Sequence, residues 1–157
     1  MMGAGKTTIG AKVATEVGVP FFDTDQMVVD MSGMSIERLW SEHGEPGFRS
    51  LERRAVERVP DSDCVVAAGG GTVLDPASRD RITRSEMVLW LKCSVTELSR
   101  RLGSKARPLL GDDVKVSLEQ ILDERASVYE EMATHMLNTD RLSVERAVMR
   151  AVRIWTA

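Results

Sequence analysis

The sequence predicts an α/β protein in which a parallel sheet is covered by helices on both faces. Short apolar runs, which favour buried strands, alternate with longer segments whose apolar residues recur every three or four positions. Strand–helix–strand connections of this kind are right-handed and make neighbouring strands parallel. The chain has 157 residues, of which 43% are hydrophobic and 29% are charged, as suits one folded domain over residues 1–157.

The first part of the chain predicts one strand and four helices. A helix is expected from Gly5 to Val17, because apolar residues repeat every four positions and Gly18 follows as a stop. Glycine and proline then punctuate the chain after each polar or amphipathic run. This pattern predicts a strand at 20–22 and helices at 26–31, 35–43 and 46–59.

The rest of the chain predicts three more strands. Cys64–Ala68 is wholly apolar and ends in three glycines, which is typical of a buried parallel strand that opens into a tight loop. Residues 87–91 form a second such run, and 136–139 a weaker one. Helices are expected near Pro76, at two capping-box patterns that begin at Ser94 and Ser117, and along an apolar stripe over 144–155. The polar segment 103–116 is predicted to be a lid.

Composition excludes several classes of protein. Lys and Arg number 21 and Asp and Glu number 24, which gives a net charge of −3. This balance gives no overall indication of binding to nucleic acid or to anionic membranes. No apolar stretch approaches the roughly 20 residues of a membrane span, and no signal-peptide pattern is present, so a cytoplasmic protein is expected. Cys64 and Cys93 lie in apolar runs and are expected to be buried free thiols.

The chain opens with residues typical of a phosphate-binding loop. Gly5, Lys6 and Thr7 form the Gly-Lys-Thr core of a P-loop, in which backbone N–H groups surround phosphates at the start of a helix. Lys6 would reach the outer phosphates, and Thr7 would bind Mg²⁺. The first glycine of the full pattern would fall just before Met1, so the motif is incomplete.

Polar residues and glycines follow the first two predicted strands. Asp23 and Asp25 end one strand, where Asp25 would serve either as the cap of the next helix or as a functional carboxylate. In the functional interpretation, one carboxylate lies near magnesium and the other accepts a hydrogen bond from a substrate hydroxyl. The glycine triplet 69–71 indicates that something approaches the backbone closely.

Three arginines could bind anions. Arg49 and Glu52 lie one helical turn apart, which fits a surface ion pair, while Arg107 and Arg125 could each be merely solvated. A pocket for a carboxylate and a transferring phosphoryl group would use the same guanidinium geometry. The residues alone leave both interpretations open.

Together, these motifs resemble the shikimate kinase family, a group of small P-loop kinases. The resemblance covers essentially the whole chain and is carried by Met2–Thr7, Phe22–Asp25, Gly44–Glu52, Gly69–Gly71, Arg107–Leu110 and Arg125. It implies a three-layer P-loop kinase fold with a lid and a parallel sheet of strand order 2-3-1-4-5. The first strand, which is central in that order, is absent from this chain. We therefore expect that the natural start lies upstream of Met1.

The resemblance also implies an activity, namely ATP-dependent phosphorylation of the shikimate 3-hydroxyl with Mg²⁺ by a monomer. Asp25 would hold the reacting hydroxyl, Lys6 and Arg107 would stabilise the γ-phosphoryl group, and Thr7 and Asp23 would serve the metal. The expected shikimate-binding residues are Asp25, Arg49, Gly70 and Arg125. The expected ATP-binding residues are Gly3, Ala4, Gly5, Lys6, Thr7, Thr8, Arg101, Arg107 and Arg141, with Arg101 and Arg141 against adenine.

Two rival functions stay open. A gluconate-type or nucleotide kinase would share the P-loop and the lid but does not predict Asp23–Asp25, the Phe48-Arg49 pair and the glycine triplet together. The second alternative is not an enzyme but an inactive, kinase-like binding module that lacks its first strand.

Overall fold

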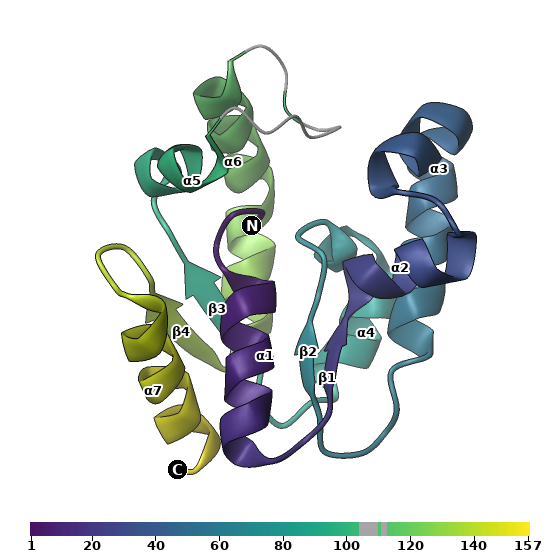
Figure 1. The fold of residues 1–157 in the computed structure, drawn as a ribbon. Helices are drawn as coiled ribbons and strands as arrows, with labels where there is room; N and C mark the ends of the chain where they lie inside the picture. Colours follow the sequence, from purple (N-terminus) through teal and green to yellow (C-terminus); the bar gives the residue numbers. More distant parts are fainter. Residues whose placement is uncertain (104–109, 111–112) are drawn as a thin grey trace.

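A computed structural model of the protein describes residues 1–103, 110 and 113–157, in which helices and short strands alternate (Figure 1). The predicted α/β class is confirmed. The elements, in order, are α1 Lys6–Val17, β1 Phe21–Asp23, α2 Thr24–Ser32, α3 Ile36–Glu57, β2 Val65–Ala67, a 3₁₀ turn η1 Thr72–Leu74, α4 Pro76–Thr83, β3 Leu89–Lys92, α5 Val95–Leu102, α6 Val114–Met132, β4 His135–Asn138 and α7 Val144–Trp155.

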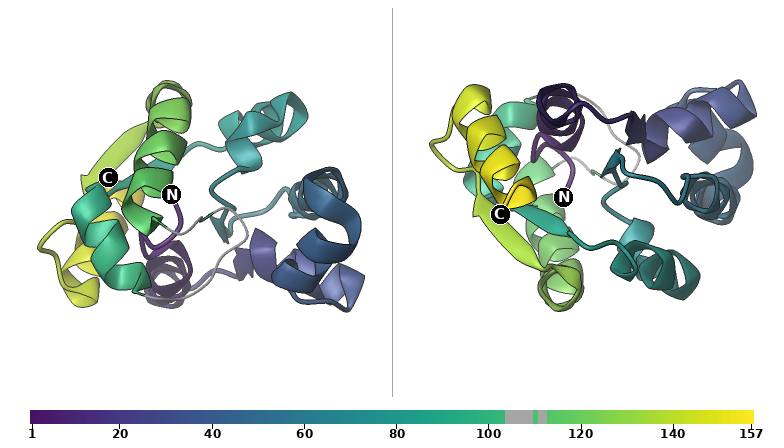
Figure 2. Two further views of the ribbon diagram at one scale, coloured as in Figure 1. Left: turned by 90° about the horizontal axis from the view of Figure 1, so that it is seen from above. Right: turned by 90° about the horizontal axis from the view of Figure 1, so that it is seen from below.

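The helices lie on both faces of the strands. Figure 2 shows α1 and α7 on one side, and α4 and α6 on the other. The main hydrophobic core fills the space between these layers and includes Val13 of α1, Leu118 of α6 and Val148 of α7. A second cluster forms between α2 and α3 around Val28 and Phe48. The α2–α3 segment thus has its own small core beside the three layers.

The strands form two separate parallel pairs. β1 pairs with β2, and β3 pairs with β4. Within the described residues, β2 and β3 form no ladder with each other, although Figure 1 shows them as the inner strands of the two pairs. This is the order 2-3-1-4-5 without its central strand, as expected.

The space between β2 and β3 is a slot lined by apolar residues of both strands. A cavity of about 860 Å³ lies there, and its lining includes Met1, Val65, Val66, Leu89 and Leu91. The prediction of a fully buried second strand is wrong, because Val66 is 39% exposed. Val66 lacks cover where the neighbouring strand would pack, so an unfilled sheet position accounts for its exposure.

Both cysteines are free thiols, but only one is buried. Cys93 follows β3 in the core, whereas Cys64 precedes β2 and is only half-buried, so the prediction for Cys64 is corrected. Burial raises the pKa of both thiols. Neither therefore has the lowered pKa that marks a reactive cysteine.

The start of α6 differs from the prediction. Ser94 caps α5 as expected, with its hydroxyl accepting a hydrogen bond from the N–H of Glu97. Ser117, however, lies inside α6, because Asp113 caps this helix earlier by accepting from the N–H groups of Lys115 and Val116. Residues 114–116 are thus helical, and most of the remaining predicted lid (104–109 and 111–112) lies outside the described residues.

The two helices predicted at 35–43 and 46–59 are joined end to end in α3. Gly44 interrupts α3 with φ 65° and ψ −174°, a conformation that favours glycine. Pro46 then begins the second segment, where it needs no hydrogen bond to its nitrogen. This kink positions Glu45 and Arg49 on the second segment. In the described part of the chain, no helix is long and apolar enough to cross a membrane.

Candidate active site

One cleft collects most of the residues that the sequence singles out. It has a volume of about 350 Å³ and lies where β1 and β2 end beside the start of α1. Ligands of open α/β sheets bind at this edge. The predicted residues that line it are Gly3, Gly5, Lys6, Thr7, Thr8, Asp23, Asp25, Arg49, Gly70, Arg101 and Arg125.

The P-loop residues leave the start of α1 open to a ligand. Gly3 and Gly5 have φ angles of 74° and 92°, which side chains rarely tolerate. Gly5 caps α1 without a side-chain hydrogen bond, and the first turn contains no acidic residue. The N–H groups of the first turn and the helix dipole therefore favour an anion. Ala4 is buried, so it could contribute to this loop only through its backbone.

Lys6 and Thr7 lie on either side of this anion site. The Lys6 ammonium donates a hydrogen bond to the carbonyl of Met1 at 2.8 Å. The Thr7 hydroxyl donates to Asp23 Oδ2 at 2.6 Å. Two side-chain oxygens are thus adjacent at the strand end, and oxygen is the donor type that Mg²⁺ prefers. The described residues contain no cluster of three or more His, Cys, Asp or Glu side chains that could hold a metal ion.

Asp23, not Asp25, caps α2. The other oxygen of Asp23 accepts hydrogen bonds from the N–H groups of Asp25 and Gln26. The alternative in which Asp25 serves as the helix cap is therefore wrong. Asp25 lies in the first turn of α2 and lines the cleft, so its carboxylate is in position to meet a ligand.

Thr24 fixes this start of α2 against the neighbouring strand. Its buried hydroxyl accepts a hydrogen bond from the N–H of Gly69 at 2.9 Å and lies 3.4 Å from the carbonyl of Ala67. The contact sets the position of Asp25 relative to the glycine triplet, because Asp25 is the next residue along the helix.

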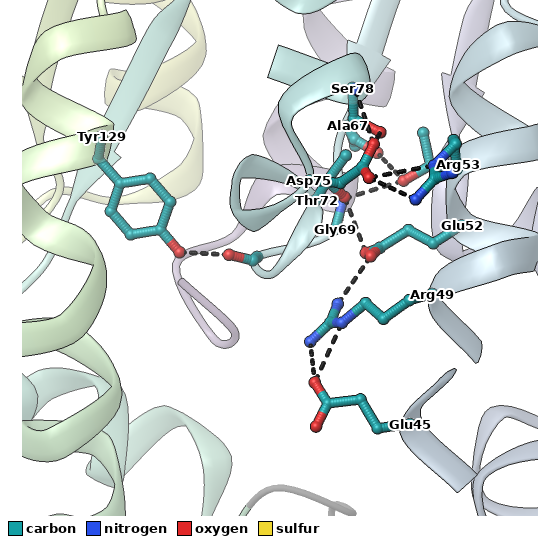
Figure 3. Close-up of polar contacts among 12 residues, drawn as sticks. Glu45, Arg49, Glu52, Arg53, Ala67, Gly69, Thr72, Asp75, Ser78 and Tyr129 are labelled. Atoms are coloured by element: carbon teal, nitrogen blue, oxygen red, sulfur yellow. Dashed lines mark hydrogen bonds and ion pairs between the residues drawn. The ribbon is translucent and has the colours of Figure 1, made fainter. Parts of the chain in front are cut away.

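Arg49 projects from α3 between two carboxylates (Figure 3). Nη1 donates to Glu52 Oε2 at 2.7 Å, while Nε and Nη2 donate to Glu45 Oε1 at 3.1 and 3.0 Å. Glu52 is only 3% exposed and also accepts from the Thr72 hydroxyl. The Arg49–Glu52 contact is thus a buried network, and the alternative of a surface ion pair is wrong.

Charge balance keeps Arg49 ionised despite its burial. Burial alone lowers the pKa of the guanidinium, but the hydrogen bonds and charges of Glu52, and then of Glu45, raise it by more. The guanidinium also lies over the Phe48 ring at 5.3 Å and the Trp40 ring at 5.9 Å. Arg49 is therefore a fixed cation at the wall of the cleft.

Two glycines of the triplet, Gly69 and Gly71, are explained by close side-chain approach. A Cβ at Gly71 would lie 2.3 Å from Arg49 Nη1, and one at Gly69 would lie 2.4 Å from Glu52 Oε1 and 2.8 Å from Asp25 Oδ1. Real Cβ atoms essentially never come this close to other atoms. The expectation that something approaches this backbone is confirmed, and the approaching groups are the site's own side chains.

Arg125 of α6 brings a second guanidinium to the cleft. It is only 4% exposed, and its Nε has no hydrogen-bond partner among the described residues. A buried charge with an unpartnered donor is unfavourable unless a ligand supplies an acceptor. The solvated alternative for Arg125 is therefore wrong.

One helical turn later, Tyr129 holds the glycine loop. Its hydroxyl donates to the carbonyl of Gly70 at 2.5 Å, as Figure 3 shows. Burial raises the pKa of this phenol, so it stays protonated as the donor. Tyr129 thus holds the carbonyl of Gly70, and Gly70 lines the cleft.

The remaining predicted arginines have different outcomes. Arg101 lies at the end of α5, where Nη2 donates to the Thr139 carbonyl at 2.8 Å and Nε to Glu97 at 2.8 Å. Hydrogen bonds from Arg100 and Arg101 lower the pKa of Glu97 to about 2. Arg141 does not line the cleft, so its adenine contact stays a prediction, and Arg107 lies outside the described residues.

Sequence reasoning assigned no role to four residues in or beside the cleft, although Glu45 and Phe48 lie within the Gly44–Glu52 motif. Trp40 and Phe48 line the cleft, Glu45 binds Arg49, and Tyr129 holds Gly70. The i, i+4 spacing of Glu45 and Arg49 was a usable signal. Nothing in the sequence pairs Tyr129 with Gly70, which lies 59 positions away.

The fold and the site are those of a P-loop kinase. A glycine-rich loop precedes α1, a lysine and a threonine begin that helix, and an aspartate ends the neighbouring strand β1. Comparison with known proteins gives the family. The family model for shikimate kinase matches residues 2–155. The chain belongs to the shikimate kinase family.

Individual relatives agree with this assignment. The chain is 41% identical to a shikimate kinase of Stenotrophomonas maltophilia, over 96% of this chain and 86% of the relative, and 40% identical to one of Salinibacter ruber, over 99% and 81%. The structure resembles shikimate kinase from Acinetobacter baumannii in complex with shikimate, with TM-score 0.93 and 27% identity over 99% of this chain and 88% of that one. The Bacteroides thetaiotaomicron enzyme gives TM-score 0.84 at 31% identity, over 99% and 94%.

Proposed function

We propose that this chain transfers the γ-phosphoryl group of ATP to the 3-hydroxyl of shikimate, giving shikimate 3-phosphate and ADP on the route to chorismate. The observation that carries the proposal is the buried Arg125, which lines the same cleft as the P-loop and whose Nε has no hydrogen-bond partner among the described residues. A substrate with a carboxylate and hydroxyl groups would supply the missing acceptor. Family membership and the solved relative in complex with shikimate support the same substrate.

The roles divide along the cleft. The N–H groups before α1 and the Lys6 ammonium would hold the phosphates of ATP. Arg125 and Arg49 would bind the carboxylate of shikimate, and the N–H of Gly70 would bind a ring hydroxyl. Asp25 would orient the reacting hydroxyl and accept its proton as the oxygen attacks phosphorus. The bond from the γ-phosphorus to the bridging oxygen breaks in line, and ADP leaves.

The catalytic contribution of these residues is mainly positioning and charge stabilisation, because phosphoryl transfer needs little covalent help from the protein. Thr7 and Asp23 would hold Mg²⁺, which supplies charge neutralisation of the phosphates when bound. Arg107 would stabilise the transferring group from the segment that lies outside the described residues.

Steady-state turnover with ATP and a panel of hydroxy acids tests the proposal. ADP formation above the ATPase background should require shikimate. Gluconate should give no rate above that background. Turnover of gluconate without turnover of shikimate would overturn the proposal in favour of the gluconate-type kinase. Binding of both ligands without any turnover would instead favour the inactive module.

A further inference from the structure

The side-on edge of the Arg49 guanidinium holds a carboxylate of the protein itself. Nε and Nη2, the two donors of that edge, both donate to Glu45 Oε1 (Figure 3). An external carboxylate that binds a guanidinium through two parallel hydrogen bonds uses the same kind of edge. Glu45 therefore occupies a place that a ligand carboxylate could take.

The two carboxylates on Arg49 differ in how firmly they are held. Glu52 is 3% exposed and has a second partner in Thr72, so it is part of the packed interior. Glu45 is 51% exposed, and within the described residues Arg49 is its only hydrogen-bond or ion-pair partner. Moving Glu45 into water thus breaks contacts only with Arg49, whereas moving Glu52 would uncover a buried charge.

Local geometry explains why Glu45 reaches Arg49. Glu45 lies between the kink at Gly44 and Pro46, and Arg49 lies four residues further along α3. Residues at this spacing face each other on a helix. The contact thus pairs the partly buried guanidinium with a carboxylate of its own helix.

We propose that Glu45 is a resident competitor for the substrate carboxylate and thereby sets the affinity and the selectivity of the cleft. The proposal rests on the proposed function, in which Arg49 binds that carboxylate. A ligand carboxylate that also reaches Arg125 gains contacts that Glu45 cannot make, so it displaces Glu45. A ligand without a carboxylate leaves Glu45 in place.

The expected size of the effect is modest. Exposed ion pairs of this kind contribute little, because water screens the charges and the side chains lose freedom. Replacing Glu45 by Gln removes the competing charge but keeps an amide oxygen as an acceptor. The dissociation constant for shikimate should then fall by about two- to fivefold.

The test is isothermal titration of the full chain with shikimate, for the wild type, Glu45→Gln and the matched control Glu42→Gln. Glu42 forms the same i, i+4 pair with an arginine of α3, Arg38, but does not touch Arg49. Only Glu45→Gln should tighten binding. It should also lower KM for shikimate without changing kcat, and it should leave the affinity for ATP and for the methyl ester of shikimate unchanged. Unchanged or weaker binding of shikimate to Glu45→Gln would overturn the inference.

A second probe separates this inference from the proposed function. Cyclohexene-1-carboxylate has the carboxylate but no hydroxyl groups, so its binding reports on the arginines alone. If only this probe binds, and binds more tightly to Glu45→Gln, the inference stands and the shikimate assignment fails. If shikimate is phosphorylated but Glu45→Gln changes neither dissociation constant, the inference fails and the assignment stands. Absence of binding for both carboxylates in both proteins would overturn the inference as well.

Discussion

The hydroxyl of Tyr129 in α6 donates a hydrogen bond of 2.5 Å to the carbonyl of Gly70 in the loop after β2. This contact joins the two halves of the cleft, because α6 also carries Arg125 while Gly70 follows the strand next to Asp25. Tyr129 thus acts as a positioning residue for the glycine loop.

Tyr129→Phe should weaken shikimate binding without affecting ATP. The ring and its packing remain, but Gly70 loses the donor that holds its carbonyl. We expect KM for shikimate to rise by about three- to tenfold, and the free energy of unfolding to fall by about 1 kcal/mol. Thr15→Val, which removes an exposed helix hydroxyl far from the cleft, is the control for loss of a hydroxyl. An equal change in KM for ATP would contradict the positioning role.

Removing either guanidinium should weaken the binding of shikimate and leave the binding of ATP unchanged. Arg49→Ala and Arg125→Ala each remove a charge-assisted contact, so the dissociation constant for shikimate should rise by about 10- to 100-fold. Arg125→Met preserves more of the buried volume and should show the same loss. Calorimetry with shikimate and with ATP measures both affinities, and Arg53→Ala, an arginine of α3 paired with Asp75, is the control. Equal loss of both ligands would count against the assigned roles.

Asp25→Asn should impair the chemical step. The amide can still hold the reacting hydroxyl but cannot accept its proton, so kcat should fall by about 10²- to 10⁴-fold with little change in binding. Asp30→Asn, on the same helix with an exposed contact to Gln26, should keep normal kcat. Retention of kcat in Asp25→Asn would show that this carboxylate is not the proton acceptor.

Gly71→Ala should displace Arg49. The added Cβ would lie 2.3 Å from Nη1, whereas a Cβ at Gly70 would meet only backbone atoms at 3.5 Å. We therefore expect Gly71→Ala to raise KM for shikimate by about tenfold, roughly the loss of one charge-assisted hydrogen bond. Gly70→Ala should raise it less. The reverse order in steady-state kinetics would contradict the proposed packing of Arg49 on this loop.

Because the slot between β2 and β3 is lined by apolar residues, we predict that a strand added there would stabilise the fold. A segment of about ten residues ahead of Met1, with five β-branched apolar residues, could pair with both inner edges. Urea unfolding should then show that the free energy of unfolding is higher than that of the original chain, by on the order of several kcal/mol. A Gly/Ser segment of the same length is the control. Equal stability of the two extended forms would contradict a strand-accepting slot.

Much of the architecture and of the site could be predicted from the sequence. The apolar runs locate the four strands found in the described residues, and the capping pattern at Ser94 locates α5, because these signals are local. The start of α6 was mispredicted because Asp113, a stronger local cap, precedes the pattern at Ser117. The exposure of Val66 depends on which strands are neighbours in space, which local periodicity does not report.

The site shows the same division between local and distant information. Lys6, Thr7, Asp25 and Arg49 are marked by motifs, and the structure places them in one cleft. The burial of Glu52 arises from its contact with Thr72, 20 positions away, so its spacing from Arg49 indicated only a surface pair. Tyr129 is found only when the fold brings α6 to the glycine loop.

The central claim is that the cleft phosphorylates shikimate at the hydroxyl held by Asp25. The most direct measurement is product analysis by ³¹P and ¹H NMR after incubation of the chain with ATP, Mg²⁺ and shikimate. We predict one phosphorylated product, in which phosphorus couples to the proton on C3, formed in equal amount with ADP. Phosphorylation at another hydroxyl, or ADP formation without any phosphorylated shikimate, would contradict it.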